Sequence, residues 1–284
     1  MKKIIIAFAG LLLTGVSFSQ KINNLTAGKI KLANGQKIIV ENISNVEASL
    51  AMGMELKSNS TSINALEVKA GTVKDYTISN TLTKLKVNMN MMGQPNNYDS
   101  DNKESNNAEM AKIFDERLNK PVDIIIDNST GIAITEKKKI KKADAEETNP
   151  ADDLMKMFAD NSDDGIVSGA FEIIPQGKLV GDSWSDTTIA KDMKMFRTYT
   201  LKSITGNDAV IQSNTITNSL NKLNFQEMEF EVKSETKSIG EILTDTNTSM
   251  VKQRTTSADI TGSIQMMGQD MPISAKTKST INYK

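Results

Sequence analysis

Apolar and polar residues alternate along most of this chain with a period of two, which is the pattern of β-strands with one buried face. In "EMEFEVKSE", Met228, Phe230 and Val232 fall on one side and charged residues fall on the other. The residues from Met193 to Thr217 contain two alternating segments around the turn signal Gly206-Asn207-Asp208, which predicts a hairpin. The pattern therefore predicts a mainly β protein, β with minor α, made of antiparallel strands.

Two segments have helical periodicity instead. In "NNAEMAKIFDERLNKP" four apolar residues share one helical face, and Asn106 is the expected N-cap. A second helix is expected from Asn149, which would cap it, with Pro150 at the first helical position. Between them, Lys137 to Lys142 form a basic block followed by acidic residues. We interpret this block as a solvated linker, with a membrane-surface or nucleic-acid contact as the alternative.

The tetrapeptide "MMGQ" occurs twice, at residues 91–94 and 266–269. Each copy follows an alternating strand and places a glycine where a turn favours positive φ. We interpret the copies as corresponding turns of two related, curved antiparallel β units with a helical insertion between them, analogous to a half-barrel. The predicted divisions are 1–19 as a signal peptide, 20–135 as a first β unit with one helix, 136–165 as a charged linker with a short helix, and 166–284 as a second β unit.

The N-terminus has the three regions of a secretory signal peptide. Lys2 and Lys3 precede the apolar run 4–13, and the small residues Ser17 and Ser19 predict cleavage after Ser19. The chain has no cysteine, so an N-terminal lipid anchor on cysteine and disulfides are both excluded. These features predict an exported, periplasmic protein without a transmembrane segment after cleavage.

Composition excludes several kinds of chemistry. The chain contains neither histidine nor cysteine, which excludes Ser-His-Asp and Cys-His catalysis and histidine metal sites. A net charge of −1 and 5% aromatic residues argue against nucleic acid as a partner. "DNSDDG" begins like a calcium loop, but Phe171 occupies the twelfth position, where a glutamate is needed, so a helix-terminating loop is the alternative. We therefore expect no enzymatic activity, no cofactor and no metal, with a carboxylate-based hydrolase as the remaining catalytic hypothesis.

Methionine is the unusual component, with 16 residues. Because its side chain is flexible and polarisable, a methionine-rich sheet surface can adapt to varied apolar ligands. The candidate ligand-binding residues are Met89, Met91, Met193, Met195, Met266 and Trp184. The alternatives are that these methionines fill the core, that thioethers bind copper, and that Trp184 anchors the core beside a turn begun by Gly181.

The segments "IIPQGKLVGDSWSDT", "TYTLKSITGNDAVI" and "NYDSD", with the leader ending "SFSQ", resemble a family of exported Bacteroidota proteins catalogued only as a domain of unknown function. The resemblance implies an extracytoplasmic location in a Gram-negative envelope and transfers no catalytic residue. Our functional hypothesis is a periplasmic, non-enzymatic protein that binds an apolar or lipid-like ligand in a methionine-rich β cup. The alternative is an envelope-associated structural or protein-interaction module without a small ligand.

Overall fold

The computed structural model describes residues 30–50, 53–91, 93–134, 163–190, 192–225, 228–266 and 269–284. These residues form one mainly β, antiparallel sheet of 11 strands, so the predicted fold class is confirmed. The predicted signal peptide, the Lys137 to Lys142 block, the Asn149 helix start, and Asp160 and Ser162 of the calcium-like loop lie outside the described residues.

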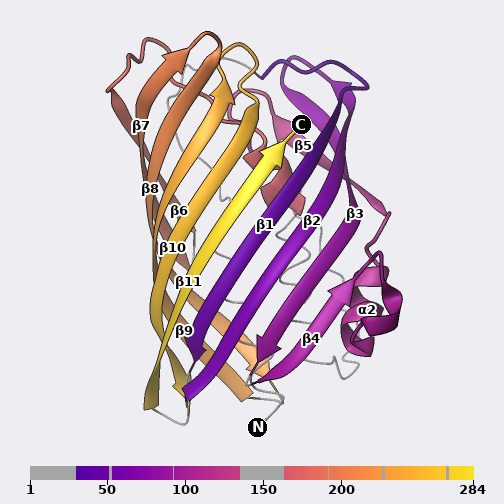
Figure 1. Cartoon of the computed structure of the whole chain (residues 1–284). Coiled ribbons are helices and arrows are strands. Elements are labelled where there is room, and N and C mark those ends of the chain that lie inside the picture. Colours follow the sequence, from indigo (N-terminus) through magenta and orange to yellow (C-terminus); the bar gives the residue numbers. More distant parts are fainter. Residues whose placement is uncertain are drawn as a thin grey trace.

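Two groups of strands, here called the first and second arms, make up this sheet (Figure 1). The first arm contains β1 (Lys37–Leu50), β2 (Met54–Gly71), β3 (Asp75–Met91), β4 (Gln94–Asp99) and β5 (Pro121–Asp127). The second arm contains β6 (Ser183–Ala190), β7 (Met193–Thr205), β8 (Asp208–Phe225), β9 (Met228–Asp245), β10 (Val251–Met266) and β11 (Gln269–Tyr283). The arms join where β1 pairs with β11, from Val40 opposite Tyr283 to Ser49 opposite Ser274.

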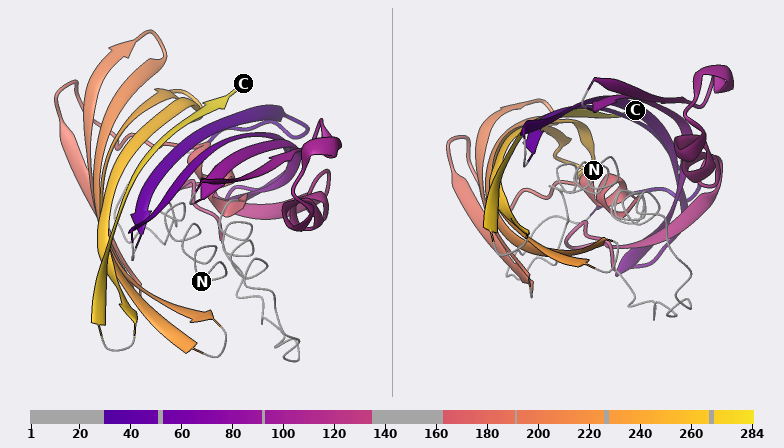
Figure 2. Two further views of the ribbon diagram at one scale, coloured as in Figure 1. Left: turned by 60° about the horizontal axis from the view of Figure 1, so that its bottom comes forward. Right: turned by 90° about the horizontal axis from the view of Figure 1, so that it is seen from below.

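The sheet is strongly curved and remains open. Its strand order is β4-β3-β2-β1-β11-β10-β9-β8-β7-β6, with β5 also paired to β3. Figure 2 shows the sheet bent into an incomplete ring, with residues 163–169, here called the inner helix, lying inside it. The concave face of the sheet is thus the face toward the inner helix, and the convex face is the outer one.

A hydrophobic core fills one end of the concave face. Val167 and Ala170, from the inner helix and the residue after it, are fully buried in the same cluster as inward side chains of both arms. Those inward side chains include Ile38, Val40, Leu66, Ile78, Leu201, Ile211, Ile242 and Tyr283. Because residues alternate between faces along each strand, every second residue from these positions also faces inward, and the parity changes where a bulge interrupts the register.

Two turns with the same hydrogen-bonding pattern lie at this end of the concave face. In 127–131, the backbone N–H groups of Ser129 and Thr130 donate to Asp127 Oδ1 at 2.8 and 2.9 Å. In 245–249, the N–H groups of Asn247 and Thr248 donate to Asp245 Oδ1, both at 2.9 Å. Both turns end on positive φ, at Gly131 (71°) and Ser249 (59°). The two turns therefore share the same hydrogen bonds and backbone conformation, although only their aspartate and one threonine are identical in sequence.

The described helices are short. The 3-10 helix η2 (Lys103–Ser105) and α2 (Ala108–Asp115) follow β4. The expected cap at Asn106 was wrong: Asn107 Oδ1 accepts from the Met110 N–H at 3.2 Å. Asn106 instead bonds both the backbone N–H and the carbonyl of Asp99, at 2.7 and 3.1 Å. The cap therefore moves by one residue because the Asn106 amide is already satisfied by the end of β4.

The hairpins predicted from alternation are present. β7 and β8 are joined by Gly206-Asn207, and Gly206 has a φ of 60°. The first "MMGQ" copy lies at the β3–β4 connection, with Gly93 at a φ of 78°. In the second copy β10 ends at Met266 and β11 begins at Gln269. Both tetrapeptides therefore lie at hairpin connections.

Candidate functional site

The concave face beyond the core is the strongest candidate for a binding surface, because its side chains change character in ordered rows. The pairing register identifies each row, since residues directly opposite on neighbouring strands lie on the same face. Three zones follow one another along the strands: the core, a row of small polar residues, and a second apolar zone near the opposite end.

The small polar row crosses six strands without interruption. Ser213 of β8 lies opposite Gly240 of β9, which lies opposite Thr256 of β10. The row continues through three serines, Ser279 of β11, Ser44 of β1 and Ser60 of β2. No bulky side chain stands in this row between Tyr199 on β7 and Val87 on β3. The concave face therefore carries a belt of hydroxyl groups beside the core.

The second apolar zone lies further along the same strands. One row runs through Ile260, Ala275, Ala48 and Leu56, all buried. A further row pairs Val232 with Ile264, also buried, and Ile264 with Met271. None of the buried residues in these two rows belongs to the core cluster at the other end. We call these rows the second apolar zone.

The predicted methionines lie on or beside this zone, but on different strands. Met195 is buried on the concave face of β7, in the row that reaches Ile260 through Thr217 and Thr236. Met89 of β3 and Met193 of β7 are half-buried. For Met91 and Met266 the structure describes only the backbone, at the ends of β3 and β10. Six strands separate β3 from β7 in the sheet order, so these methionines do not form one compact cluster along the sheet.

Sequence reasoning did not single out Leu56, Ile260 and Ile264, which make up much of the zone. The sequence does indicate that each of them faces the buried side of its strand, because each lies between polar neighbours. The same alternation occurs in every strand, however, and only the cross-strand register shows which apolar residues meet.

Trp184 lies on β6 and is half-buried against the core cluster. Its ring stacks on Tyr199, with centroids 5.5 Å apart and planes inclined by 14°. Gly181, just before it, has a φ of 96°, as expected for the turn that precedes the strand. These contacts are those of a core anchor.

Two buried ion pairs lie on or beside the concave face: one between the core and the second apolar zone, the other beside the core. Arg197 Nε donates to Asp186 Oδ1 at 2.7 Å, across the β6–β7 pair. Arg254 Nη2 of β10 donates to Glu172 Oε2 at 3.0 Å, after the inner helix. Burial, followed by the charge of Glu172, raises the pKa of neighbouring Tyr199 far above its ordinary value of 10. We call Arg197, Asp186, Glu172 and Arg254 the ionic cluster.

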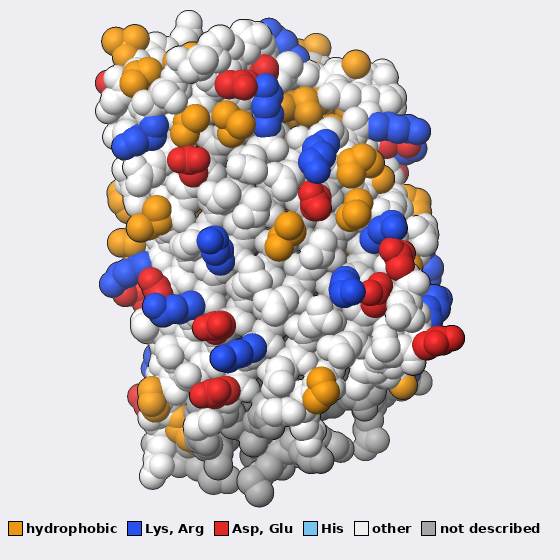
Figure 3. Space-filling view, viewed as in Figure 1, with side chains coloured by type: hydrophobic (Ala, Val, Ile, Leu, Met, Phe, Trp, Pro, Cys, Tyr) orange, Lys and Arg blue, Asp and Glu red, His pale blue; other side chains and the backbone are white. Residues whose placement is uncertain are grey.

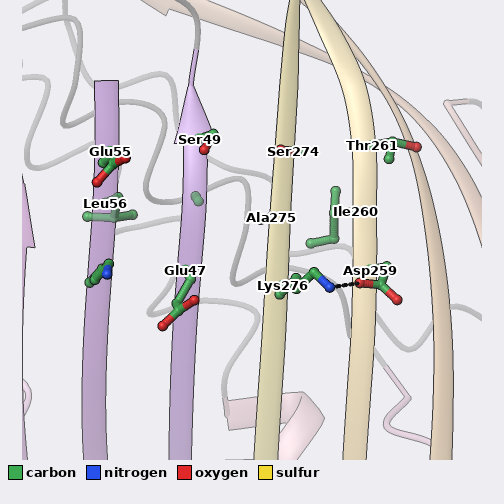
Figure 4. A pocket seen from close by; sticks show the side chains of 12 residues that line it. Glu47, Ser49, Glu55, Leu56, Asp259, Ile260, Thr261, Ser274, Ala275 and Lys276 are labelled. Carbon is green, nitrogen blue, oxygen red and sulfur yellow. Dashed lines mark ion pairs between the residues drawn. The ribbon is translucent and has the colours of Figure 1, made fainter. Parts of the chain in front are cut away.

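The convex face of the central strands shows no comparable order. Over β10, β11, β1 and β2 it displays scattered charges of both signs and few apolar side chains (Figure 3). A hollow of about 380 Å³ on these strands is lined by charged residues, among them Glu47, Glu55, Asp259 and Lys276 (Figure 4). Its lining also includes Ala48, Leu56, Ile260 and Ala275 of the second apolar zone. Its three carboxylates are all exposed, and Lys276 lies 3.6 Å from Asp259. This hollow lacks the buried carboxylate pair that the hydrolase hypothesis requires.

Metal-binding groups do not gather in the part of the chain that the structure describes: no three aspartates or glutamates there could share an ion. Asp164 and Gly165 of the calcium-like loop belong to the inner helix. The "NYDSD" segment forms an Asx turn, in which the Asp101 N–H donates to Asp99 Oδ1 at 3.0 Å. Lys86 and Lys84 pair with Asp99 and Asp101.

Within the described residues, no helix is long and apolar enough to cross a membrane.

Comparison with known proteins gives a family and a fold. Residues 73–251 match a family described as "Family of unknown function (DUF6263)". No curated protein matches the chain. Among solved structures the chain is similar to one described as "Lipid-protein interactions in lipovitellin", with a TM-score of 0.50 and 8% sequence identity. The match covers 89% of this chain and 25% of the other, so the chain spans about a quarter of that relative's length.

Weaker similarities involve outer membrane channels. OccK5 (OpdH) of Pseudomonas aeruginosa matches at 7% identity and a TM-score of 0.25, covering 88% of this chain and 98% of that one. A channel from Pseudomonas putida F1 matches at 7% identity and a TM-score of 0.22, covering 94% and 100%. Scores this low do not indicate a shared fold.

Proposed function

We propose that this chain, which belongs to the DUF6263 family of unknown function, binds an apolar or lipid-like ligand on the concave face of its sheet and catalyses no reaction. The observation that carries the proposal is the second apolar zone. It places Ile260, Ile264 and Leu56 on the inside of a curved sheet, away from the core cluster. A concave apolar surface with a few polar groups is the usual form of a small-molecule site.

Hydrophobic burial can supply the affinity. A ligand that loses about 300 Å² of apolar surface gains on the order of 7 kcal/mol, at about 25 cal/mol per Å². Part of this gain is offset by the lost freedom of ligand and side chains. The flexible methionines beside the zone, Met89, Met193 and Met271, can adjust to ligands of different shape.

The similarity to lipovitellin supports the proposal at the level of the fold. That relative is described by its lipid–protein interactions, and the two chains share a fold at a TM-score of 0.50. The likeness extends over most of this chain but a quarter of the other, so the ligand of the relative is a guide to chemical class only.

We also propose that the protein works in the periplasm after removal of residues 1–19. The supporting observations are the basic start, the apolar run and the small residues before Gln20. A carrier or sensor of lipid-like molecules has a clear use between two membranes, where such molecules are poorly soluble in water.

Native mass spectrometry of residues 20–284, purified from the periplasm without detergent, tests the binding. We expect an adduct of lipid mass that is lost on mild activation. A variant with Met89→Gln, Met193→Gln and Met271→Gln should retain less than a tenth of this adduct. The matched control, Ile189→Gln, Phe196→Gln and Ile239→Gln on the convex face, should retain it. Equal adduct in both variants, or none in the parent protein, would refute the proposal.

A second candidate function rests on the convex face of the second arm. Four apolar side chains, Ile189, Phe196, Ile216 and Ile239, cross β6 to β9 on a diagonal and are exposed by 67, 45, 42 and 60%. Exposed apolar side chains on neighbouring strands favour a protein-interaction module. A dimer in the native spectrum that disappears in the convex-face variant, together with an apo monomer, would support this alternative.

A further inference from the structure

The ionic cluster contains hydrogen-bonding groups that the protein itself does not satisfy. Arg197 Nη2, Arg254 Nε and Glu172 Oε1 are buried and have no hydrogen-bond partner. Glu172 and Arg197 are only 5 and 7% exposed. Buried polar groups without partners cost about 1–3 kcal/mol each, and more when charged. Such groups in a native protein therefore need a function or a partner from outside the chain.

The Arg197–Asp186 pair of the cluster lies between the core and the second apolar zone, and Arg254 lies opposite the core residue Ile242. Along the concave face of β7, Leu201 and Tyr199 belong to the core, Arg197 follows, and Met195 comes next. Met195 belongs to the row that leads to Ile260. A ligand lying on the second apolar zone therefore has one end directed at the ionic cluster.

The neighbours of Arg197 along the sheet are small, although the guanidinium itself is buried. Across β8, β9 and β10 its row contains Thr215, Ser238 and Ala258, which are all small. The next row toward the core is the small polar row. On β8, β9 and β10 both rows therefore carry only small side chains beside Arg197.

We propose that the ionic cluster binds the carboxylic acid head of a long-chain fatty acid whose chain lies on the second apolar zone; this inference rests on the proposed function. The free groups are two donors, on Arg197 and Arg254, and one acceptor, on Glu172. A protonated carboxyl group offers the complement, because its carbonyl oxygen accepts and its hydroxyl group donates.

Charge balance selects a carboxylic acid over a phosphate. The two arginines are already balanced by Asp186 and Glu172, so the cluster is neutral as a whole. A dianionic phosphate would add two uncompensated charges to a buried site, which is strongly unfavourable. A neutral carboxyl group adds none, and a carboxylate adds one.

Three ligands with the same sixteen-carbon chain test this inference on the unmodified protein. Each displaces the uncharged fluorescent probe N-phenyl-1-naphthylamine from residues 20–284. We expect palmitic acid to bind at least tenfold more tightly than methyl palmitate, which cannot donate, and than hexadecyl phosphate. Equal binding of acid and methyl ester would overturn the head site and leave the proposed function standing. Tighter binding of the phosphate would overturn the carboxylic class, and no binding of any ligand would overturn both proposals.

A matched pair of variants tests the residues. Arg197→Met with Asp186→Leu removes one ion pair without leaving a buried charge unpaired. We expect it to lower palmitic acid affinity to that of methyl palmitate and to leave methyl palmitate unchanged. The control, Lys276→Met with Asp259→Leu, removes an exposed pair and should keep the tenfold preference. A cluster variant that keeps the preference would overturn the inference. If that variant does not fold by circular dichroism, the ligand series on the unmodified protein decides alone.

Discussion

At the scale of single residues, Gly131 and Ser249 occupy the same position in two turns of like construction, with φ angles of 71° and 59°. A Cβ at Gly131 would approach the Phe171 Cβ to 2.9 Å. Ser249 has its Cβ in a backbone region that glycine adopts freely, that asparagine and aspartate tolerate, and that is unfavourable for other residues. We therefore expect glycine at position 249 to stabilise the fold and serine at position 131 to destabilise it.

Ser249→Gly should raise the free energy of unfolding by about 1 kcal/mol, because it relieves the left-handed backbone. Gly131→Ser should lower it by about 1–3 kcal/mol, because it adds both strain and the contact with Phe171. Urea denaturation followed by circular dichroism measures both. Destabilisation by Ser249→Gly would show that the Ser249 side chain matters more than its backbone.

The aspartates of these turns predict a pH dependence. Burial alone would raise the pKa of Asp127 and Asp245, but hydrogen bonds from Ser129 and Thr130, and from Thr248 and Asn247, lower it below the ordinary value. The unfolded chain then binds protons more readily than the folded one, so stability rises with pH in this window. The contribution is present above about pH 4 and is lost as the pH falls through the folded pKa values.

Asp245→Asn tests this dependence, because asparagine keeps the Oδ1 acceptor but does not titrate. Urea unfolding at pH 5.5 and pH 3.0 should show a smaller loss of stability in the variant than in the parent. The same loss in both proteins would mean that Asp245 does not contribute to acid sensitivity.

At the scale of elements, the inner helix and the residues after it close one end of the sheet. Tyr283 Oη donates to the Ile166 carbonyl at 3.2 Å, and the Glu172 N–H donates to the Ser249 carbonyl at 2.9 Å. Phe171 is buried in the core cluster, close to Gly131 of one turn and in a β-bridge with Met250, just after the other. Removal of its ring would leave a cavity shared by the segment and both arms.

Phe171→Ala should therefore lower the free energy of unfolding by about 3–5 kcal/mol. Phe196→Ala, on the exposed convex face, should lower it by less than about 1 kcal/mol. Urea denaturation of the two variants gives the comparison. Similar losses would show that residues 163–174 are not an integral part of the core.

Prediction from sequence succeeded where the signal was local. Alternation identified the strands, and Gly206 and Gly93 marked turns that exist with positive φ. The N-cap of α2 was misplaced by one residue because its neighbour, Asn106, binds Asp99 across a loop. A cap competes with tertiary hydrogen bonds that no local pattern reveals.

At the scale of the whole molecule, the join between the arms and the concave rows could not be predicted. β1 pairs with β11 through residues such as Ala48 and Ala275, which lie far apart along the chain. The Arg254–Glu172 pair likewise joins residues 82 positions apart. Such contacts follow from strand order, and alternation alone gives no strand order.

The strand order also explains how a chain without catalytic histidine or cysteine can carry a function. Curvature places apolar groups from both arms and charged groups of the second arm on one inner surface, with the core at one end. We propose that an apolar ligand lies on that surface, along the second apolar zone.

Photocrosslinking with a palmitic acid analogue that carries a diazirine near its methyl end tests this claim most directly. After irradiation of residues 20–284, peptide mass spectrometry locates the crosslink. We predict labelling in β10 and β11, around Ile264 and Met271, where the second apolar zone lies furthest from the ionic cluster. Labelling confined to Ile189, Phe196 and Ile239 on the convex face, or no specific labelling, would contradict the account.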